Sequence, residues 1–306
     1  MLNNEGIWSV QAPAKLNLFF EVLGRRDDGY HDIVSLAVPV SLYDTLTFEP
    51  TNDELLTFFC EGDATGIPQD DRNIVVRAVE LLCRRIGRQY GAKITLTKRI
   101  PVQAGLGGGS SDAAAVLKTA NEAWQLGLSR EWLRSLSAEV GSDCPIFFES
   151  GPSVSRGRGE IIEPFRSLPK MFFVIVKPDE GLSTASVYAE CMKYSDGRLH
   201  FLEKELQSLS GASSLADWGR FFFNRLETPA AAIWEGFFAT RRLFDGLNCH
   251  AVQMSGSGTA FFALCDHPGH AEKVAEVIRR KKPGMTVLLA QSISDGEDFS
   301  NGPFKE

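Results

Sequence analysis

The stretch PVQAGLGGGSSDAAAV, residues 101–116, combines the residue types that bind phosphate through the backbone. Glycine lets consecutive N–H groups point into one concavity, and the unpaired N–H groups at the start of a following helix also attract an anion. We therefore expect this loop to cradle phosphates. The residues that would line it are Gly105, Gly107, Gly108 and Gly109, with Ser110 and Ser111 as hydroxyl donors. A tight glycine turn followed by a serine helix cap is the alternative.

The two common phosphate-binding patterns do not describe this loop. No lysine follows the last glycine, so the GxxxxGK[ST] pattern fails, and Ser110 stands where GxGxxG, counted from Gly105, needs its third glycine. The chain also lacks the HRD and DFG signatures of protein kinases. The loop therefore belongs to another class of phosphate-binding protein.

Two other segments place charged or amide side chains beside apolar ones. In APAKLNLFF, residues 12–20, strand alternation puts Lys15 and Asn17 on one face, opposite two leucines. In GSDCPIFF, residues 141–148, Asp143 lies between a helix-ending glycine and an apolar run. A solvent-exposed sheet face would explain the first pair without function, and a turn or cap would explain Asp143.

Hydrophobic periodicity predicts the elements that position these residues. Residues 92–98 alternate as a strand that leads directly into the glycine loop. Apolar residues at three- and four-residue intervals predict a helix over 73–87, capped by Asn73 and ended by Gly87. A second helix is expected over 110–127, with a serine or aspartate cap and Gly127 as its end, and a third over 129–141.

The remaining sequence favours two domains. The start of the chain is rich in strand-like runs, residues 151–160 resemble a turn or a hairpin, and MFFVIVKP from Met171 begins a strand-then-helix pattern. We place the domains at 1–160 and 161–295, with a polar tail at 296–306.

Composition excludes several classes of protein. A formal charge of −7 without a basic cluster argues against nucleic-acid or anionic-membrane partners, so an anionic ligand must be held locally. The six cysteines are scattered without CxxC or zinc spacing, which favours buried, reduced thiols. We find no secretory signal and no apolar run of membrane-spanning length, and we expect a cytoplasmic protein.

Taken together, the glycine loop, APAKLNLFFEVLGRRDDGYHDIVSL, GSDCPIFF and MSGSGTAFFAL resemble the motifs of the GHMP kinases, in the same order. Within that superfamily they are most similar to the branch that phosphorylates 4-diphosphocytidyl-2-C-methyl-D-erythritol. The similarity spans roughly residues 8–295. The resemblance implies an α+β fold in two lobes, an N-terminal domain like ribosomal protein S5 and a ferredoxin-like C-terminal domain.

The resemblance also implies roles for individual residues. Asp143 would be the general base and Lys15 its electrostatic partner. ATP would be the co-substrate, with Mg²⁺ on its phosphates, although no metal ligand is implied. The ATP-binding residues would be Pro101, Gly105, Leu106, Gly107, Gly108, Gly109, Ser110 and Ser111. The small-molecule substrate would be bound by Asn17, Tyr30, His31, Thr184, Tyr188, Gly256 and Gly258, with the two tyrosines stacked on either side of the cytosine.

Two positions depart from the family pattern, and one of them is Cys144, which stands where a small aliphatic residue is commoner. FNRLE resembles the family's NDLE-type segment, but Arg225 replaces the usual acidic residue. A tight turn would explain Gly256 and Gly258 without a function. Surface packing would explain Tyr30 and His31 in the same way. Other functions also stay open: a homoserine or mevalonate type of kinase, a non-catalytic nucleotide or metabolite binder, and an RNA-binding module. The sequence does not predict an oligomeric state.

Overall fold

Two long strands, β1 (Trp8–Arg25) and β2 (His31–Thr51), open the described part of the chain. The computed structural model describes residues 6–63, 65–165, 168–191, 193, 202–208 and 214–294. Its contacts divide the chain into two units. Unit 1 comprises Met1–Ala14, Leu42–Val102 and Gly107–Glu149, and unit 2 comprises Lys15–Ser41, Gln103–Leu106 and Ser150–Glu306. The boundary at residue 160 stays a prediction, and the predicted tail at 296–306 lies outside the described residues.

The sheet of unit 1 places its strands in the order β3-β4-β2-β1. β3 (Leu56–Gly62) runs parallel to β4 (Gly91–Lys98), and β4 runs antiparallel to β2. The predicted alternation in β4 is confirmed, because Ile94 and Leu96 are buried while Lys93 is exposed. The apolar face thus turns toward the helices of the unit.

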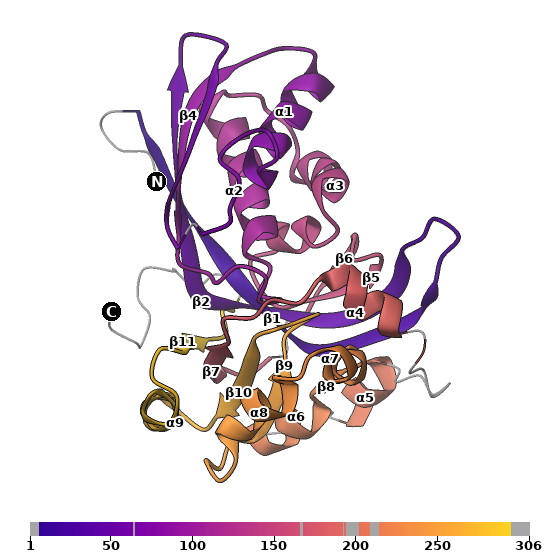
Figure 1. The fold of residues 1–306 in the computed structure, drawn as a ribbon. Helices are drawn as coiled ribbons and strands as arrows, with labels where there is room; N and C mark the ends of the chain where they lie inside the picture. The colour runs from indigo at the N-terminus through magenta and orange to yellow at the C-terminus, as the bar shows by residue number, and fades with distance from the viewer. Residues whose placement is uncertain are drawn as a thin grey trace. The chain divides into compact units, whose positions relative to one another are not determined.

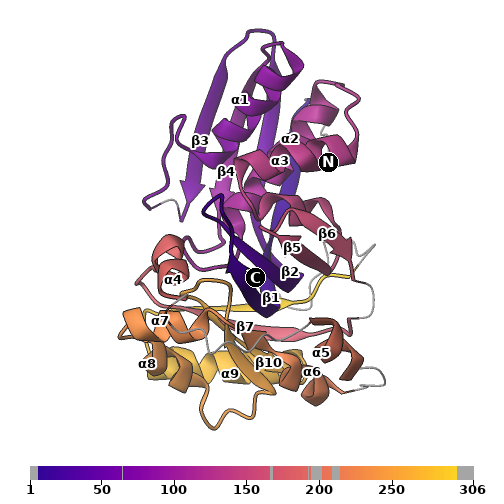
Figure 2. The same ribbon diagram turned by 90° about the vertical axis from the view of Figure 1, so that its right-hand side faces the viewer.

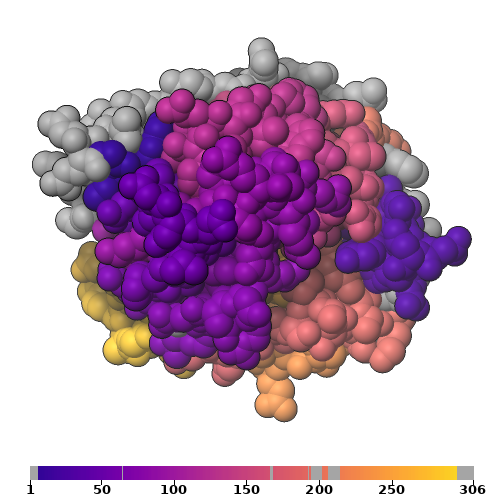
Figure 3. Space-filling view, turned by 90° about the horizontal axis from the view of Figure 1, so that it is seen from above, coloured from indigo at the N-terminus to yellow at the C-terminus, as the bar shows by residue number. Residues whose placement is uncertain are grey.

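Three helices cover one side of this sheet (Figure 1). They are α1 (Ile74–Ile86), α2 (Gly108–Ala123) and α3 (Arg130–Val140), followed by the 3-10 helix η1 (Cys144–Phe148). The predicted caps of α1 are confirmed: Asn73 accepts a hydrogen bond from the N–H of Val75, and Gly87 ends the helix with φ 71°. Ser129 likewise caps α3. Figure 3 shows the outer surface of this unit in violet and magenta.

Unit 2 adds short strands to its parts of β1 and β2. The predicted hairpin is confirmed as β5 (Ser153–Gly157) and β6 (Ile161–Pro164), with β5 antiparallel to β2. β8 (Phe223–Asn224) pairs in parallel with β1, Phe19 opposite Phe223. This pairing brings the FNRLE segment next to the strand that carries Lys15.

A second sheet in unit 2 is fully antiparallel, in the order β11-β7-β10-β9. Figure 2 shows helices of the unit along one side of it. The strands are β7 (Phe172–Lys177), β9 (Ala251–Met254), β10 (Phe261–Cys265) and β11 (Thr286–Gln291). The helices are α4 (Thr184–Cys191), α5 (Leu202–Ser208), α6 (Leu215–Phe221), α7 (Glu227–Ile233), α8 (Phe237–Arg241), η2 (Arg242–Phe244) and α9 (Pro268–Lys281).

This arrangement is the ferredoxin-like order of two split β-α-β units, as predicted. The two-lobed α+β fold class is therefore confirmed. Each unit has its own apolar core: Phe48, Leu82 and Leu117 belong to that of unit 1, and Val174 and Phe261 to that of unit 2. Among the described residues, every helix is too short or too polar to cross a lipid bilayer.

Candidate active site

Lys15 and Asn17 lie on the same face of β1, as strand alternation requires. Both are only 4% exposed, which rules out the solvent-exposed sheet face. The Lys15 ammonium donates to Asn17 Oδ1 at 2.5 Å and to the carbonyl oxygen of Gly105 at 2.8 Å. Asn17 Nδ2 in turn donates to Ser35 Oγ at 2.8 Å. A buried cation held by oxygen acceptors is costly to place in a core for packing alone, so this network is a candidate for function.

The first glycine of the loop is fixed to this network. Ser255 Oγ also donates to the carbonyl of Gly105, at 2.9 Å, and the backbone N–H of Lys15 donates to the carbonyl of Leu106 at 2.9 Å. Gly105 has φ +74°, and a Cβ there would lie 1.9 Å from the carbonyl oxygen of Ser255. Only glycine can therefore occupy this position.

The MSGSGTAFFAL motif comprises the end of β9, the turn at 255–260 and most of β10, and its turn reaches the same network. A Cβ on Gly256 would lie 3.3 Å from both Asn17 Oδ1 and Lys15 Nζ. Asn224 Nδ2 donates to the carbonyls of Met254 and Gly256, at 2.8 Å each. The turn is thus held against the lysine and the amide. For Gly258, φ +87° and a Cβ distance of 2.6 Å to the sulfur of Met254 account for glycine by packing.

Sequence reasoning missed several residues that build this network. Ser35 positions Asn17, Ser255 positions Gly105, and Asn224 positions the turn. Gln253 belongs with them, since its Nε2 donates to the carbonyl of Asn17 at 2.8 Å. The family-like FNRLE segment was the signal available for Asn224.

The residues predicted to bind the cytosine lie at three places within unit 2. The rings of His31 and Tyr188 contact each other, with centroids 5.0 Å apart and planes at 34°. Tyr30 is 50% exposed and packs its ring against the guanidinium of Arg158, 4.7 Å from the ring centroid. Thr184 Oγ1 lies 2.8 Å from Ser257 Oγ, beside the glycine turn.

His31 carries a polar atom in need of a partner. Its Nε2 is buried and, in the described part of the chain, has no hydrogen-bond partner. Burial, and the nearby charge of Arg25, lower the pKa of His31, so the ring is neutral at pH 7. A neutral imidazole nitrogen without a partner can form a hydrogen bond with a ligand.

In unit 1 the helix α2 begins earlier than predicted. The expected serine or aspartate cap is wrong: Gly107, at φ 72°, occupies the N-cap, and no side chain caps the helix. The N–H groups of Gly108, Gly109 and Ser110 are presented by the first turn of the helix, whereas the N–H of Ser111 already donates to the carbonyl of Gly107 at 2.9 Å. Gly127 is also not the end of the helix, which finishes at Ala123.

A buried ion cluster supports this first turn. Lys98 Nζ donates to Asp112 Oδ2 at 2.8 Å and also to Asp44. Asp44 Oδ1 accepts from the N–H groups of Arg99 and Ile100, at 2.6 and 2.9 Å. Burial raises the pKa of Asp112 to about 7. A Cβ on Gly108 would lie 3.0 Å from Ile100 Cγ2 and 3.2 Å from Lys98 Nζ, so a larger residue would require these neighbours to move.

The aspartate motif lies next to the start of α2 within unit 1. The Ser110 hydroxyl hydrogen-bonds the thiol of Cys144, whose pKa burial raises to about 12. Asp143, the residue before it, stands at the N-cap of η1, but its exposed side chain does not cap that helix. The cap alternative therefore explains why the backbone of Asp143 lies at the start of η1, but it does not explain the carboxylate. Pro101 is buried in this unit, just ahead of the glycine loop.

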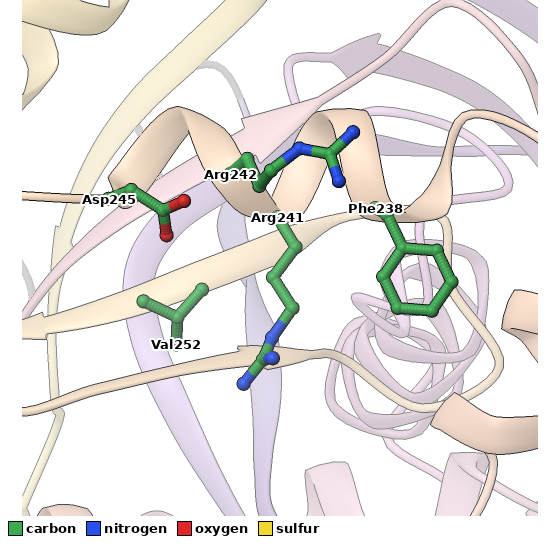
Figure 4. Close-up of a pocket in the computed structure, with 5 residues that line it drawn as sticks. All are labelled: Phe238, Arg241, Arg242, Asp245 and Val252. Carbon is green, nitrogen blue, oxygen red and sulfur yellow. The ribbon is translucent and has the colours of Figure 1, made fainter.

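The predicted site residues are divided between the two units. Unit 1 holds Pro101, Gly107, Gly108, Gly109, Ser110, Ser111 and Asp143. Unit 2 holds Lys15, Asn17, Tyr30, His31, Gly105, Leu106, Thr184, Tyr188, Gly256 and Gly258. A separate pocket in unit 2 lies among α8, η2 and β9 (Figure 4). It is lined by Phe238, Arg241, Arg242, Asp245 and Val252, and so contains none of the predicted residues.

Comparison with known proteins identifies the family of this chain. Residues 73–151 match the GHMP kinases N terminal domain, and residues 211–284 match the GHMP kinases C terminal domain. A 4-diphosphocytidyl-2-C-methyl-D-erythritol kinase of Shouchella clausii is 36% identical over 89% of this chain and 90% of its own length. The enzyme of the same name from Listeria monocytogenes serotype 4a is 34% identical over 96% and 99%.

Solved structures give the same relationship. The crystal structure of a 4-(cytidine 5'-diphospho)-2C-methyl-D-erythritol kinase has a TM-score of 0.77 and 32% identity, and the match covers 94% of this chain and 100% of that one. The L. major mevalonate kinase in complex with R-mevalonate reaches a TM-score of 0.74 over 97% and 100%, at 15% identity, and so shares the fold. The chain therefore belongs to the GHMP kinases, a family of small-molecule kinases that use ATP.

Proposed function

We propose that this kinase phosphorylates the 2-hydroxyl of 4-diphosphocytidyl-2-C-methyl-D-erythritol with ATP, in the non-mevalonate route to isoprenoid precursors. The observation that carries the proposal is the similarity, over about nine-tenths of the chain, to kinases named for this substrate in several organisms. The buried Lys15–Asn17–Gly105 network supports it. Such a network resembles a site built around a polar acceptor rather than a structural core.

In the proposed reaction, Asp143 accepts the proton of the attacking hydroxyl as the oxygen bonds to the γ-phosphorus of ATP. A positioned general base typically contributes about 10²–10⁴-fold. Lys15 stabilises negative charge on the transferred group, because phosphoryl transfer depends largely on positioning and electrostatics. Asn17 orients the substrate, and its amide is already held in place by Ser35.

The first turn of α2 would bind the phosphates of ATP. It is uncapped by side chains, so its backbone N–H groups and the positive end of the helix dipole can meet an anion. Ser111 Oγ is buried and, among the described residues, lacks a hydrogen-bond partner. With the Ser110 hydroxyl it offers the oxygen ligands that Mg²⁺ takes in proteins. The ion would neutralise charge on the β- and γ-phosphate oxygens.

His31, Tyr30 and Tyr188 would bind the cytosine. The unpartnered Nε2 of His31 is a hydrogen-bonding atom of the kind that reads a base edge, and Tyr188 beside it offers an aromatic face. Base stacking on an aromatic side chain contributes about 1–3 kcal/mol. Thr184 and the turn at Gly256 and Gly258 would complete the pocket on the side of the reacting hydroxyl.

Coupled ADP release tests the proposal. The full chain is assayed with ATP and Mg²⁺ and either 4-diphosphocytidyl-2-C-methyl-D-erythritol, homoserine or mevalonate. Turnover with the cytidine compound alone is expected, since neither small alcohol has a ring for Tyr188 and His31. Faster turnover with homoserine or mevalonate would assign the other type of GHMP kinase. Nucleotide binding without turnover of any acceptor would assign a non-catalytic role.

A further inference from the structure

Two cysteines and a histidine that are scattered in sequence meet at one end of the β9–β10 pair. Leu264 lies opposite Ala251, and the N–H of His250 donates to the carbonyl of Leu264 at 2.9 Å. This register sets Cys249, just before β9, beside Cys265, the last residue of β10. His270 then enters from the first turn of α9. The whole cluster lies within unit 2.

The spacing of the three ligand atoms suits a small cation. One ligand atom from each of Cys249, Cys265 and His270 lies within 4.8 Å of the others. Two thiolates on one tetrahedral zinc stand about 3.8 Å apart, since each Zn–S bond is about 2.3 Å. Small side-chain movements would therefore close the set. Cys265 is buried, whereas Cys249 and His270 are partly exposed, so the cluster has a closed side and an open one.

Neighbouring groups orient the histidine as in known zinc sites. Asp266 contacts His270 Nδ1 through its Oδ2, at 3.0 Å, and through its backbone N–H, at 3.3 Å, which leaves Nε2 as the ligand atom. A ligating histidine commonly has its second nitrogen held by a carboxylate in this way. His270 Nε2 lies 2.9 Å and Cys249 Sγ 3.9 Å from the same carbonyl oxygen, that of Leu247. Nitrogen and sulfur thus converge on one point.

We propose that Cys249, Cys265 and His270 bind one Zn²⁺, with water or the Leu247 carbonyl as the fourth ligand. Thiolate and imidazole ligands select a metal of this softness over Mg²⁺ or Ca²⁺. Binding releases the two thiol protons to solvent, and the neutral imidazole of His270 would bind through Nε2 with its proton on Nδ1, facing Asp266 Oδ2. The site lies at the end of β9 and β10 opposite to the glycine turn. The metal would therefore fasten the two strands to α9 without taking part in phosphoryl transfer.

Metal titration of the reduced, chelator-treated full chain tests the site. Native mass spectrometry should show one Zn²⁺ per chain, Tm should rise with Zn²⁺, and Co²⁺ should give a thiolate-to-cobalt charge-transfer band. Cys249→Ser and His270→Gln should each weaken Zn²⁺ binding at least about tenfold. His267→Asn is the matched control, because it removes a neighbouring imidazole but keeps an acceptor at the N-cap of α9.

Three results would overturn the zinc site. The first is no stoichiometric Zn²⁺ uptake by the reduced chain. The second is equal affinity in the wild type and in both ligand variants. The third is a wild-type chain that, isolated without reductant, is lighter than the reduced chain by two hydrogens while Cys249→Ser is not, which would make the cysteines a disulfide pair. None of these results depends on kinase activity.

Discussion

Replacing Arg225 should reveal what this unusual residue does. Its guanidinium meets the carboxylate of Glu21 through two contacts, Nε to Oε1 at 2.7 Å and Nη2 to Oε2 at 2.9 Å. The Glu21 side chain is fully buried and that of Arg225 is 14% exposed. Glu21 Oε1 also accepts from the N–H of Val22. Arg225 therefore neutralises a buried carboxylate at the pairing of β8 with β1, and the departure from the family pattern is a structural ion pair.

The cost of breaking this pair follows from its burial. Removing one partner of a buried ion pair typically costs about 3–5 kcal/mol, because the other charge stays buried without compensation. The slight exposure of Arg225 favours the lower end. We expect Arg225→Met to destabilise the protein by about 3 kcal/mol, which lowers Tm by roughly 6–12 °C for domains of this size. Arg225→Asp, the family-like residue, should cost more, since it sets a second carboxylate beside Glu21.

Urea and thermal denaturation followed by circular dichroism measure the effect. Glu21→Gln combined with Arg225→Met should be more stable than Arg225→Met alone, because no charge is then left unpaired. Arg220→Met is the matched control. The side chain of Arg220 is 82% exposed, so its ion pair with Asp217 should contribute less than about 1 kcal/mol to stability. A loss below about 1 kcal/mol for Arg225→Met, or no gain in the double variant, would refute the argument.

Four further predictions address the site. Asp143→Asn should lower kcat by about 10²–10⁴ with little change in substrate binding, and wild-type turnover would remove the base assignment. Gly109→Ala adds a Cβ that would meet only Ile74, at 3.5 Å, and it should raise KM for ATP without changing KM for the cytidine substrate. The control Gly269→Ala, in the first turn of α9, should change neither KM value. Tyr188→Ala should raise KM for the cytidine substrate about 5- to 150-fold, and an unchanged KM would place Tyr188 outside the pocket. The pKa of Asp112 in the folded protein, about 7, exceeds its unfolded value, so its protonation stabilises the fold at low pH and this contribution is lost as pH rises through 7. Asp112→Asn should therefore gain stability relative to the wild type as pH rises from 4 to 7. A difference in unfolding free energy that stays constant over this range, measured by urea denaturation, would contradict this.

Local rules predicted much of the fold and part of the site. Asn73 and Ser129 cap their helices because a side-chain oxygen within two or three residues of an N–H needs no tertiary partner. The same rule failed at α2, where it favoured a serine or aspartate cap. Gly107 takes the cap at φ 72°, a conformation that glycine adopts without strain, and the serines enter the first turn. Backbone geometry thus outweighed side-chain capping where a glycine loop meets a helix.

The contacts that the sequence could not supply join residues far apart in the chain. Lys15 meets Gly105 across 90 positions, and Gln253 meets Asn17 across 236. Periodicity can predict that each lies on a strand or turn, but the partner depends on which strands pair and in what register. Cys249, Cys265 and His270 illustrate the same limit. Their spacing fits no zinc pattern, because the register of β9 with β10 and the start of α9, rather than a short loop, bring the three side chains together. A cluster assembled by sheet register leaves no local signature, so a search by spacing overlooks it even when every ligand is present.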